Sequence, residues 1–152
     1  MSEQDNMALV RRYLEHGFQE AIRGNLDVVH QYFADHYHDH SPLHPEHAGV
    51  HGLKEIIADT GQAMPDVRNE VLHIAAAGDL VFVHWQATGT HQQQHQITKH
   101  ARHLEPSGAE ESVSGINLYR IEGGKFVEGW HYHTVLEYVQ ALAQGRSAAG
   151  SS

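Results

Sequence analysis

The sequence predicts an α+β fold, with helices in the first part of the chain and antiparallel strands in the rest. Up to about residue 63, apolar residues recur at intervals of three and four positions, which is the period of an amphipathic helix. From about residue 68, apolar and β-branched residues form short runs separated by turn sequences, as in strands joined by hairpins. Helices followed by consecutive strands indicate a sheet with its helices segregated from its strands.

The first predicted helix spans residues 7–22, because one stripe of its surface is apolar. Gly24 and Asn25 suit its end, since glycine and asparagine tolerate the backbone of a helix C-cap. A short second helix should follow, with its apolar residues facing inward. The stripe of the first helix consists of Met7, Val10, Leu14, Phe18 and Ile22, and that of the second consists of Leu26, Val29, Tyr32 and Phe33.

Pro42 and Pro45 exclude a helix from Tyr37 to Pro45, because proline lacks the amide hydrogen that the helical ladder needs. We therefore expect a loop after the second helix. A third helix is predicted over residues 52–63, and Pro65 follows its end.

The second half of the chain reads as two strand pairs, each joined by a turn that contains glycine. Between the pairs, residues 92–104 are polar, and we expect an extended, solvated arm or a loop at the mouth of a pocket. Residues 136–142 should form a short closing helix. The predicted strands are residues 70–76, 80–90, 113–121 and 125–134.

The length of 152 residues predicts one domain of ordinary size, which we place at residues 1–145, followed by a flexible tail at residues 146–152. The net charge of −9 argues against nucleic acid or an anionic membrane as the main partner. The absence of cysteine excludes disulfides, thiolate catalysis and cysteine-based zinc sites. Since no apolar run reaches 18 residues and the N-terminus lacks a basic and then hydrophobic leader, we expect a cytoplasmic protein.

Histidine is the most unusual part of the composition. The chain has 16 histidines, and most are clustered, at residues 36–51, at residues 91–103 and at His131 and His133. Histidine changes charge near neutral pH and is the commonest metal ligand. Protonation of all 16 would change the net charge from −9 to +7. The sequence therefore indicates proton transfer, metal binding or a response to pH.

Seven short motifs follow one another along the chain, and in this order they resemble the SnoaL-like polyketide cyclase family of the nuclear-transport-factor-2-like superfamily. The resemblance covers roughly residues 8–142. It implies a cone-shaped barrel, made of a curved, mostly antiparallel sheet wrapped on the N-terminal helices, with a deep pocket and usually a homodimer. The motifs are Tyr37-His38-Asp39-His40-Ser41-Pro42, Gly52-Leu53-Lys54, Met64-Pro65-Asp66, Gly78-Asp79-Leu80-Val81, Gly89-Thr90-His91, Gly115-Ile116-Asn117-Leu118-Tyr119-Arg120 and Gly124-Lys125-Phe126-Val127-Glu128-Gly129-Trp130.

Members of this family include aldol-type cyclases, epoxide hydrolases and cyclases, isomerases and non-catalytic binders, so the fold alone does not settle the reaction. The resemblance implies a histidine at the edge of the pocket where His40 stands. A neutral imidazole there could accept a proton from carbon or donate to a carbonyl, and the alternative is a histidine bonded to its own loop. His36 and His38 are expected to be solvated.

The final strand offers further catalytic candidates. Because alternate residues of a strand face opposite sides, Trp130 lies on one face and His131 and His133 on the other, and the sequence leaves open which face is inward. The resemblance implies acids here, one of them an acid/base group of aldol-type cyclases, but this chain has His131 and Thr134 in their places. We expect His40, His131 and His133 to be catalytic, with a polar outer face at a dimer contact as the alternative for the last two.

The predicted substrate-binding residues, besides Tyr37, lie on the strands. His84 stands in an apolar strand, so it should be partly buried, either in a structural hydrogen bond or in the pocket. Asn117 replaces what is commonly an acid in the family and could orient a carbonyl. Trp85, Tyr119 and Trp130 are either core residues or platforms on which a planar ligand stacks.

A metal site is the minor alternative to a protein without a cofactor. His36, His38 and His40 would share one side only in an extended segment, and His131 and His133 repeat the spacing. Such imidazoles could bind zinc or nickel, but the spacing is not a known metal signature. The resemblance implies no cofactor.

We therefore expect a cofactor-independent cyclase or isomerase that acts on a hydrophobic carbonyl or polyketide-like small molecule. One histidine would remove a proton next to the carbonyl, and Tyr37, His84 or Asn117 would donate a hydrogen bond to the enolate oxygen. The alternatives are a non-catalytic dimer that binds a small molecule, an epoxide hydrolase or cyclase with Asp66 and Glu128 as its carboxylates, and a metal enzyme with histidine ligands.

Overall fold

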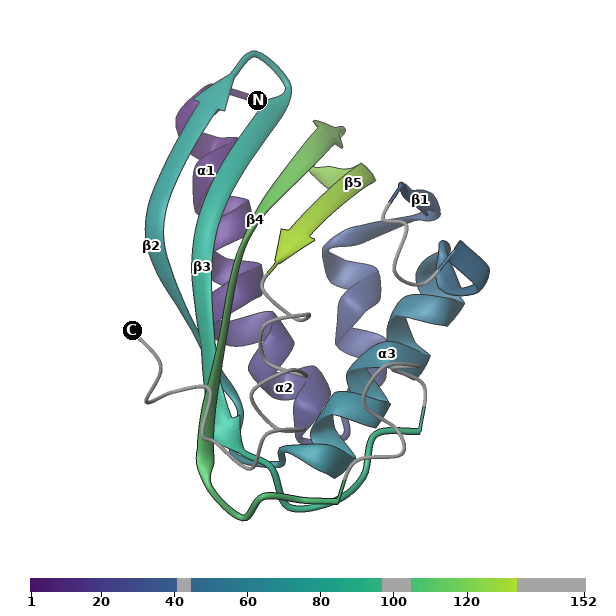
Figure 1. The fold of residues 1–152 in the computed structure, drawn as a ribbon. Coiled ribbons are helices and arrows are strands. Elements are labelled where there is room, and N and C mark those ends of the chain that lie inside the picture. The colour runs from purple at the N-terminus through teal and green to yellow at the C-terminus, as the bar shows by residue number, and fades with distance from the viewer. Residues whose placement is uncertain (41–44, 97–104, 134–152) are drawn as a thin grey trace.

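The structure consists of an N-terminal helical part and a curled five-stranded sheet (Figure 1). It is a computed structural model that describes residues 1–40, 45–96 and 105–133. The helical elements are α1 (Glu3–Arg12), the π-helix η1 (Tyr13–Gly17), α2 (Phe18–Ile22), the 3₁₀ helices η2 (Leu26–Gln31) and η3 (Pro45–His47), and α3 (Val50–Ala63), and the strands are β1 (Phe33–Asp39), β2 (Arg68–Ala77), β3 (Leu80–Thr90), β4 (Glu110–Glu122) and β5 (Lys125–His133).

The strands lie in the order β1-β5-β4-β3-β2. Three neighbouring pairs are antiparallel, and β1 runs parallel to β5. Two hairpin turns have glycines with positive φ, at Gly78 (62°) and at Gly123 and Gly124 (57° and 75°), as the turn sequences predict. The predicted α+β class, with a curved, mostly antiparallel sheet on N-terminal helices, is confirmed.

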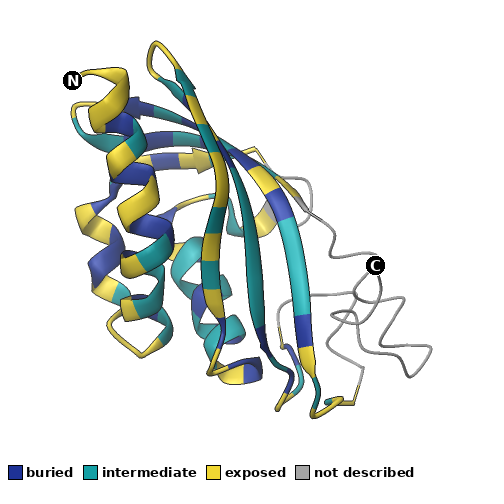
Figure 2. Ribbon diagram, turned by 90° about the vertical axis from the view of Figure 1, so that its left-hand side faces the viewer, coloured by how far each residue is buried: buried dark blue, intermediate teal, exposed yellow. Residues whose placement is uncertain are grey.

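The first predicted helix is confirmed with an earlier start, because α1, η1 and α2 form one continuous helical run. Ser2 caps it: the amide of Asp5 donates to Ser2 Oγ at 3.0 Å, and the amide of Ser2 donates to the Asp5 carboxylate at 3.1 Å. α3 begins two residues before the third predicted helix and ends with it. The helices lie on one face of the sheet, which we call the inner face (Figure 2).

Alternation along the strands divides the side chains between this inner face and the opposite, outer face. Val81 and Val83 of β3 are fully buried on the inner face, whereas Phe82 between them is 45% exposed on the outer face. On the helical side, Tyr13 packs edge-on against Phe33 and Phe126, with ring centroids 4.9 and 5.6 Å apart. The core therefore lies between the inner face and the helices.

Residues 33–39 are the main departure from the predicted elements. The sequence pattern places Phe33 in the second helix, but η2 ends at Gln31 and Phe33 begins β1. The Phe33 ring packs against Phe126 at 4.8 Å and against Tyr37 at 4.7 Å. β1 pairs with β5, which follows it by about 90 residues, and a local sequence pattern carries no signal of so distant a partner.

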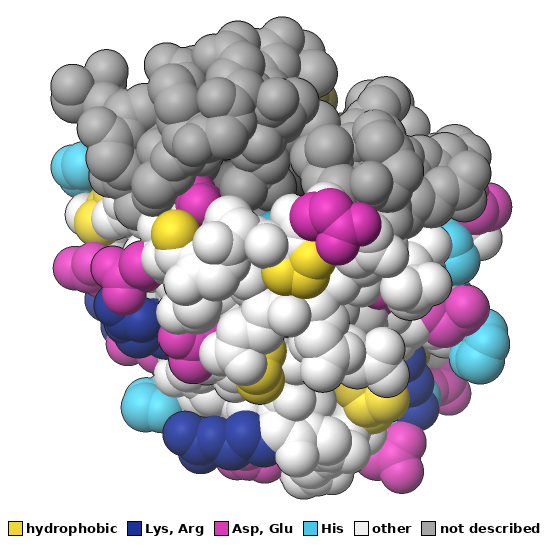
Figure 3. Space-filling view, turned by 60° about the horizontal axis from the view of Figure 1, so that its bottom comes forward, with side chains coloured by type: hydrophobic (Ala, Val, Ile, Leu, Met, Phe, Trp, Pro, Cys, Tyr) yellow, Lys and Arg dark blue, Asp and Glu magenta, His cyan; other side chains and the backbone are white. Residues whose placement is uncertain are grey.

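Three predictions lie outside the described residues: the closing helix at 136–142, the tail at 146–152, and the part of the polar arm at 97–104. In the described ranges, no helix is both long enough and apolar enough to cross a membrane. Figure 3 brings forward the lower end of the molecule, where the described surface carries charged and histidine side chains and hydrophobic ones only in small, separate spots.

Gly129 of β5 is expected to be essential for the position of β1. A Cβ atom there would overlap the Tyr37 hydroxyl, so Gly129→Ala should destabilise the protein by about 1–3 kcal/mol through overpacking. Denaturant unfolding measures this loss. In the background of Tyr37→Phe the loss should shrink. Gly49→Ala is the matched control, since nothing lies within 4 Å of its Cβ position. An equal loss in both backgrounds would contradict this packing.

Candidate active site

A carboxylate, an imidazole and a phenol meet on the inner face where β1 pairs with β5. Asp39 is opposite Gly129 in the parallel pairing, so the side chains of Tyr37 and Asp39 lie beside that of His131. Nε2 of His131 is 3.0 Å from Oδ2 of Asp39 and 3.3 Å from the hydroxyl oxygen of Tyr37. His131 and Asp39 are each about one-fifth exposed (19%), so a small molecule can reach them.

Two residues of β4 extend this cluster. Asn117 lies directly across from His131 in the β4–β5 pairing. Its Nδ2 donates to the hydroxyl oxygen of Tyr119 at 2.9 Å, and the Tyr119 ring meets the His131 ring edge-on at 5.6 Å. Tyr37, Asp39, Asn117, Tyr119 and His131 therefore form one polar cluster, which we call the inner cluster.

Burial fixes the protonation state of the two phenols. Tyr37 and Tyr119 are 3% and 1% exposed. Burial raises the pKa of both hydroxyls well above the usual value of 10, and neighbouring tyrosines and the charge of Asp39 raise both further. The hydrogen bond from Asn117 acts in the opposite direction on the Tyr119 pKa. Both phenols therefore stay neutral and keep their hydroxyl hydrogens at physiological pH.

The contact with Asp39 also determines which nitrogen of His131 is basic. A carboxylate next to Nε2 favours the tautomer in which Nε2 carries the hydrogen, and the lone pair is then on Nδ1. Asp39 would also stabilise the imidazolium that forms when Nδ1 takes a proton, as the carboxylate does in a Ser-His-Asp triad. The inner cluster can accept a proton and return it.

The structure does not bring His40 to this cluster. His40 points to the outer face, where Nε2 is 2.8 Å from Glu128 and the ring stacks on Trp130 with centroids 4.8 Å apart. The Arg120 guanidinium donates hydrogen bonds to the same Glu128 at 3.0 Å and to Asp79 at 2.9 Å. The expectation that His40 and His131 line one hollow is therefore corrected: neighbouring strand positions alternate, so Asp39 faces inward and His40 outward.

The other predicted residues divide by the same alternation. Trp85, Asn117 and Tyr119 lie on the inner face, as a substrate-binding role requires. His84 and Trp130 lie on the outer face, and Nδ1 of His84 is 3.0 Å from Nδ1 of His73. The backbone of His133 follows that of His131 in β5, but its side chain lies outside the described residues.

The metal alternative gains no geometric support. β1 is extended, so His36, His38 and His40 do share one side, and His36 and His38 are exposed as expected. Even so, in the part of the chain that the structure describes, no three His, Cys, Asp or Glu side chains are grouped to hold a metal ion.

A second polar cluster lies near the end of α3, and the sequence analysis missed it. His91 and His95 are buried (0% and 6% exposed), so the expectation of a solvated arm is corrected for these two side chains. The alternative of a loop at the mouth of a pocket stays a prediction. Nδ1 of His95 is 3.3 Å from Asp59, whose other oxygen accepts from the amide of Gln96 at 2.6 Å. The buried Glu111 accepts from the hydroxyl of Ser107 at 3.1 Å. These contacts attach the segment after β3 to α3 and β4.

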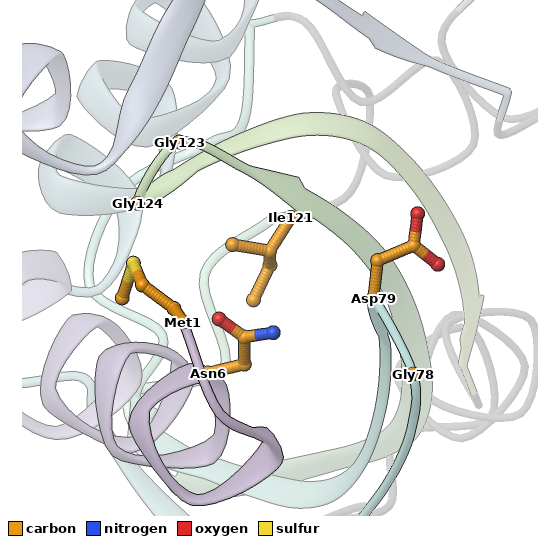
Figure 4. A pocket seen from close by; sticks show the side chains of 7 residues that line it. All are labelled: Met1, Asn6, Gly78, Asp79, Ile121, Gly123 and Gly124. Atoms are coloured by element: carbon orange, nitrogen blue, oxygen red, sulfur yellow. The ribbon is translucent and has the colours of Figure 1, made fainter.

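A small pocket of about 230 Å³ opens at the end of the sheet that carries the two hairpin turns (Figure 4). It is lined by Asn6 of α1, by Ile121 of β4 and by residues of both turns. It lies roughly 20 Å along β5 from His131, so it is not the deep hollow that the resemblance implies. That hollow stays a prediction.

Asp39 is the residue of the inner cluster that the sequence analysis missed. It belongs to the motif Tyr37–Pro42, in which the expected acid/base group was His40. The signal was the spacing: in an extended segment Asp39 shares a face with Tyr37 and not with His38 or His40. The carboxylates that were considered lie elsewhere, since Asp66 accepts hydrogen bonds from Thr90 and Glu128 lies on the outer face.

Comparisons with known proteins agree with this architecture. The model of the SnoaL-like polyketide cyclase family matches residues 8–144. Among curated proteins, none matches this sequence. The fold is similar to that of a proposed SnoaL-like polyketide cyclase from Jannaschia sp. CCS1, with a TM-score of 0.76, 20% identity and 93% of each chain covered.

Two further solved structures are similar over almost their whole length. AclR, a proposed hydroxylase from Streptomyces galilaeus, has a TM-score of 0.74 and 22% identity, with 94% of this chain and 98% of AclR covered. IdmH, a proposed polyketide cyclase from Streptomyces antibioticus, has a TM-score of 0.69 and 19% identity, with 95% of this chain and 99% of IdmH covered. At these identities the likeness concerns the fold alone.

The second cluster should make folding sensitive to acid. Burial, with help from nearby His95, lowers the pKa of His91 in the folded protein. Below about pH 6.5 the unfolded chain binds this proton more readily than the folded one, so the free energy of unfolding should fall on acidification, by at most about 1.4 kcal/mol per pH unit from this group. Denaturant unfolding between pH 7.5 and 5 measures the slope. His91→Gln should flatten it, whereas the exposed control His51→Gln should not. Equal slopes in the wild type and His91→Gln would refute this assignment.

Proposed function

The chain belongs to the SnoaL-like polyketide cyclase family, and from this premise we propose that it is a cyclase or isomerase that uses His131 as its acid/base group on a hydrophobic carbonyl or polyketide-like molecule. One observation carries the proposal: on the inner face, Nε2 of His131 contacts both the carboxylate of Asp39 and the phenol of Tyr37. Independence from a cofactor, a catalytic role of His133 and a cytoplasmic location stay predictions.

The proposed reaction begins with a proton next to the substrate carbonyl. Nδ1 of His131 takes this proton, the C–H bond breaks, and its electron pair forms the enolate. Asp39 stabilises the imidazolium through Nε2. The enolate carbon then attacks a second carbonyl in the same molecule and forms the new C–C bond. The resulting alkoxide takes the proton back from His131, so the enzyme returns to its starting state.

A neutral donor next to the base would stabilise the enolate oxygen. Tyr37 stays protonated because burial raises its pKa, and its hydroxyl is part of the inner cluster. Asn117 is not included in this role, because its Nδ2 already donates to Tyr119. In a site that excludes water, one such donor contributes about 2.7–4 kcal/mol to the stability of the charged state. His84, on the outer face, is not included in this role.

Epoxide opening is less well supported. It would use a pair of carboxylates, and Asp39 is the one carboxylate that the described residues place in the inner cluster. Asp66 is engaged by Thr90, whose hydrogen bonds lower the Asp66 pKa, and Glu128 is engaged by His40 and Arg120. A non-catalytic binder would need no acid/base pair, so the experiment below separates it from the enzyme.

Exchange of carbon-bound protons tests the proposed base without the natural substrate. The protein in D₂O should accelerate deuterium uptake next to the carbonyl of 2-tetralone, followed by NMR. His131→Ala should lower the catalysed rate about 10²–10⁴-fold, because general base catalysis contributes that much. Asp39→Asn should lower it less, since the base remains but loses the carboxylate beside its Nε2.

His40→Ala is the matched control, because it removes an imidazole from the outer face. Its exchange rate should equal that of the wild type. The proposed chemistry is wrong if His131→Ala retains the full exchange rate, or if neither the wild type nor any variant exchanges protons faster than buffer alone. A non-catalytic binding protein is then the remaining function.

We also propose that the protein is a homodimer that associates through the outer face of the sheet. Four large apolar side chains on this face are 38–63% exposed, which is unusual for a surface that faces water. The charged pair Arg120 and Glu128 lies at the margin, as at the rim of a protein interface. The four exposed residues are Leu72, Phe82, Ile116 and Tyr132.

Charge placed on this face should separate the two copies. Phe82→Arg with Tyr132→Arg should change the mass in light scattering from a dimer to the 17.0 kDa of one chain, because an unpaired charge cannot be buried in an apolar contact. His16→Arg, at an exposed position of the helical run, should leave the mass unchanged. A wild type that is already monomeric at micromolar concentration would refute the dimer.

A further inference from the structure

Two buried polar atoms on the inner face have no hydrogen-bond partner among the described residues: Nε1 of Trp85 and Oδ1 of Asn117. Almost all buried polar groups in proteins are paired, because an unpaired one loses its hydrogen bonds to water and gains none in return. Indole is a donor only, and Oδ1 of an amide is an acceptor only. The inner face therefore presents one unused donor and one unused acceptor.

The strand register places these two residues near each other and near the base. Trp85 is opposite Gly115 in the β3–β4 pairing, and Asn117 is two residues further along β4, so they are diagonal neighbours at about 7–8 Å between backbones. Asn117 is opposite His131 on the other side. Gly115, between them, contributes no side chain to the inner face, and a strand glycine often marks a place where a ligand approaches the backbone.

The arrangement is specific in its hydrogen-bond polarity. Tyr119 already holds Nδ2 of Asn117, so the amide presents its oxygen to the site. A ligand must then supply an acceptor to Trp85 and a donor to Asn117. A carboxylate fits poorly, because its charge would face the Asn117 oxygen and, beyond His131, the carboxylate of Asp39.

We propose that Trp85 and Asn117 are specificity-determining residues that select a neutral hydroxyketone. The indole N–H donates to the ligand's carbonyl oxygen, and the ligand's hydroxyl donates to Asn117 Oδ1, over Gly115 and beside His131. This inference rests on the proposed function and deepens it, because it states which oxygen groups the substrate presents. Alternating carbonyl and hydroxyl groups are the pattern of a polyketide chain.

The indole N–H resonance reports on the bond directly. The chain has two tryptophans, so a ¹⁵N-labelled sample gives two indole signals, and Trp130→Phe assigns them. Three matched naphthalenes serve as probes: 4-hydroxy-2-acetonaphthone, whose hydroxyl cannot reach its own carbonyl, 2-acetonaphthone and 2-ethylnaphthalene. The Trp85 proton should move downfield with both ketones and not with the hydrocarbon, because only a carbonyl oxygen accepts the hydrogen bond.

Affinities measured by calorimetry separate the two residues. Wild-type protein should bind the hydroxyketone about three- to tenfold more tightly than the ketone, and the ketone more tightly than the hydrocarbon by a similar factor. Trp85→Phe should remove the preference for the ketone over the hydrocarbon. Asn117→Leu should remove the preference for the hydroxyketone over the ketone. Far-ultraviolet circular dichroism and thermal unfolding establish that each variant is folded, and if one is not, the indole shift in the wild-type protein still decides.

The inference is overturned if the Trp85 signal responds equally to the hydrocarbon, or if it responds to none of the probes, which would leave water alone as its partner. It is also overturned if the variants keep the wild-type order of affinities. These measurements involve no turnover. A Trp85 signal that responds to ketones in a protein without proton exchange would refute the proposed function and leave this inference intact. Proton exchange in a protein whose Trp85 signal does not respond would refute this inference and leave the proposed function intact.

Discussion

The parallel pairing of β1 with β5 is the constraint on which the rest of this structure depends. It joins two segments about 90 residues apart and is fastened at its start by the contact of Phe33 with Phe126 and near its end by the hydrogen bond from the amide of His40 to the carbonyl of Gly129. This pairing sets Asp39 beside His131 at hydrogen-bond distance. Without it, the acid and the base would be on separate elements with no fixed relation.

Strand alternation then places the histidines in different surroundings. His131 lies on the inner face with a carboxylate and two neutral phenols, whereas His40 and His84 lie on the outer face with Glu128 and His73 as partners. His91 and His95 are buried in a third place, beside Glu111 and Asp59. The histidines of this chain therefore occupy several different environments rather than one site, and acid/base chemistry is proposed for one of these environments.

The sequence was sufficient for those features that depend on local patterns. The period of three to four residues located the first helix, and the turn glycines located the hairpins, because both signals lie within a few residues of each other. It was also sufficient to name Tyr37, Asn117, Tyr119 and His131. It did not reveal β1, the partner Asp39, or the outward direction of His40, because each depends on which distant strand pairs with residues 33–39 and in which register. The burial of His91 was not predicted for the same reason, since its neighbours come from α3 and β4.

The tautomer of His131 is the most direct test of the central claim that Asp39 makes this imidazole a base at Nδ1. Long-range ¹H–¹⁵N correlation spectra of the histidine side chains, assigned with His131→Ala and recorded at neutral pH, distinguish the protonated ring nitrogen from the bare one. The account predicts a hydrogen on Nε2 and a lone pair on Nδ1 in the wild type, and loss of this preference in Asp39→Asn. A hydrogen on Nδ1 in the wild type, or the same tautomer with and without the carboxylate, would contradict it.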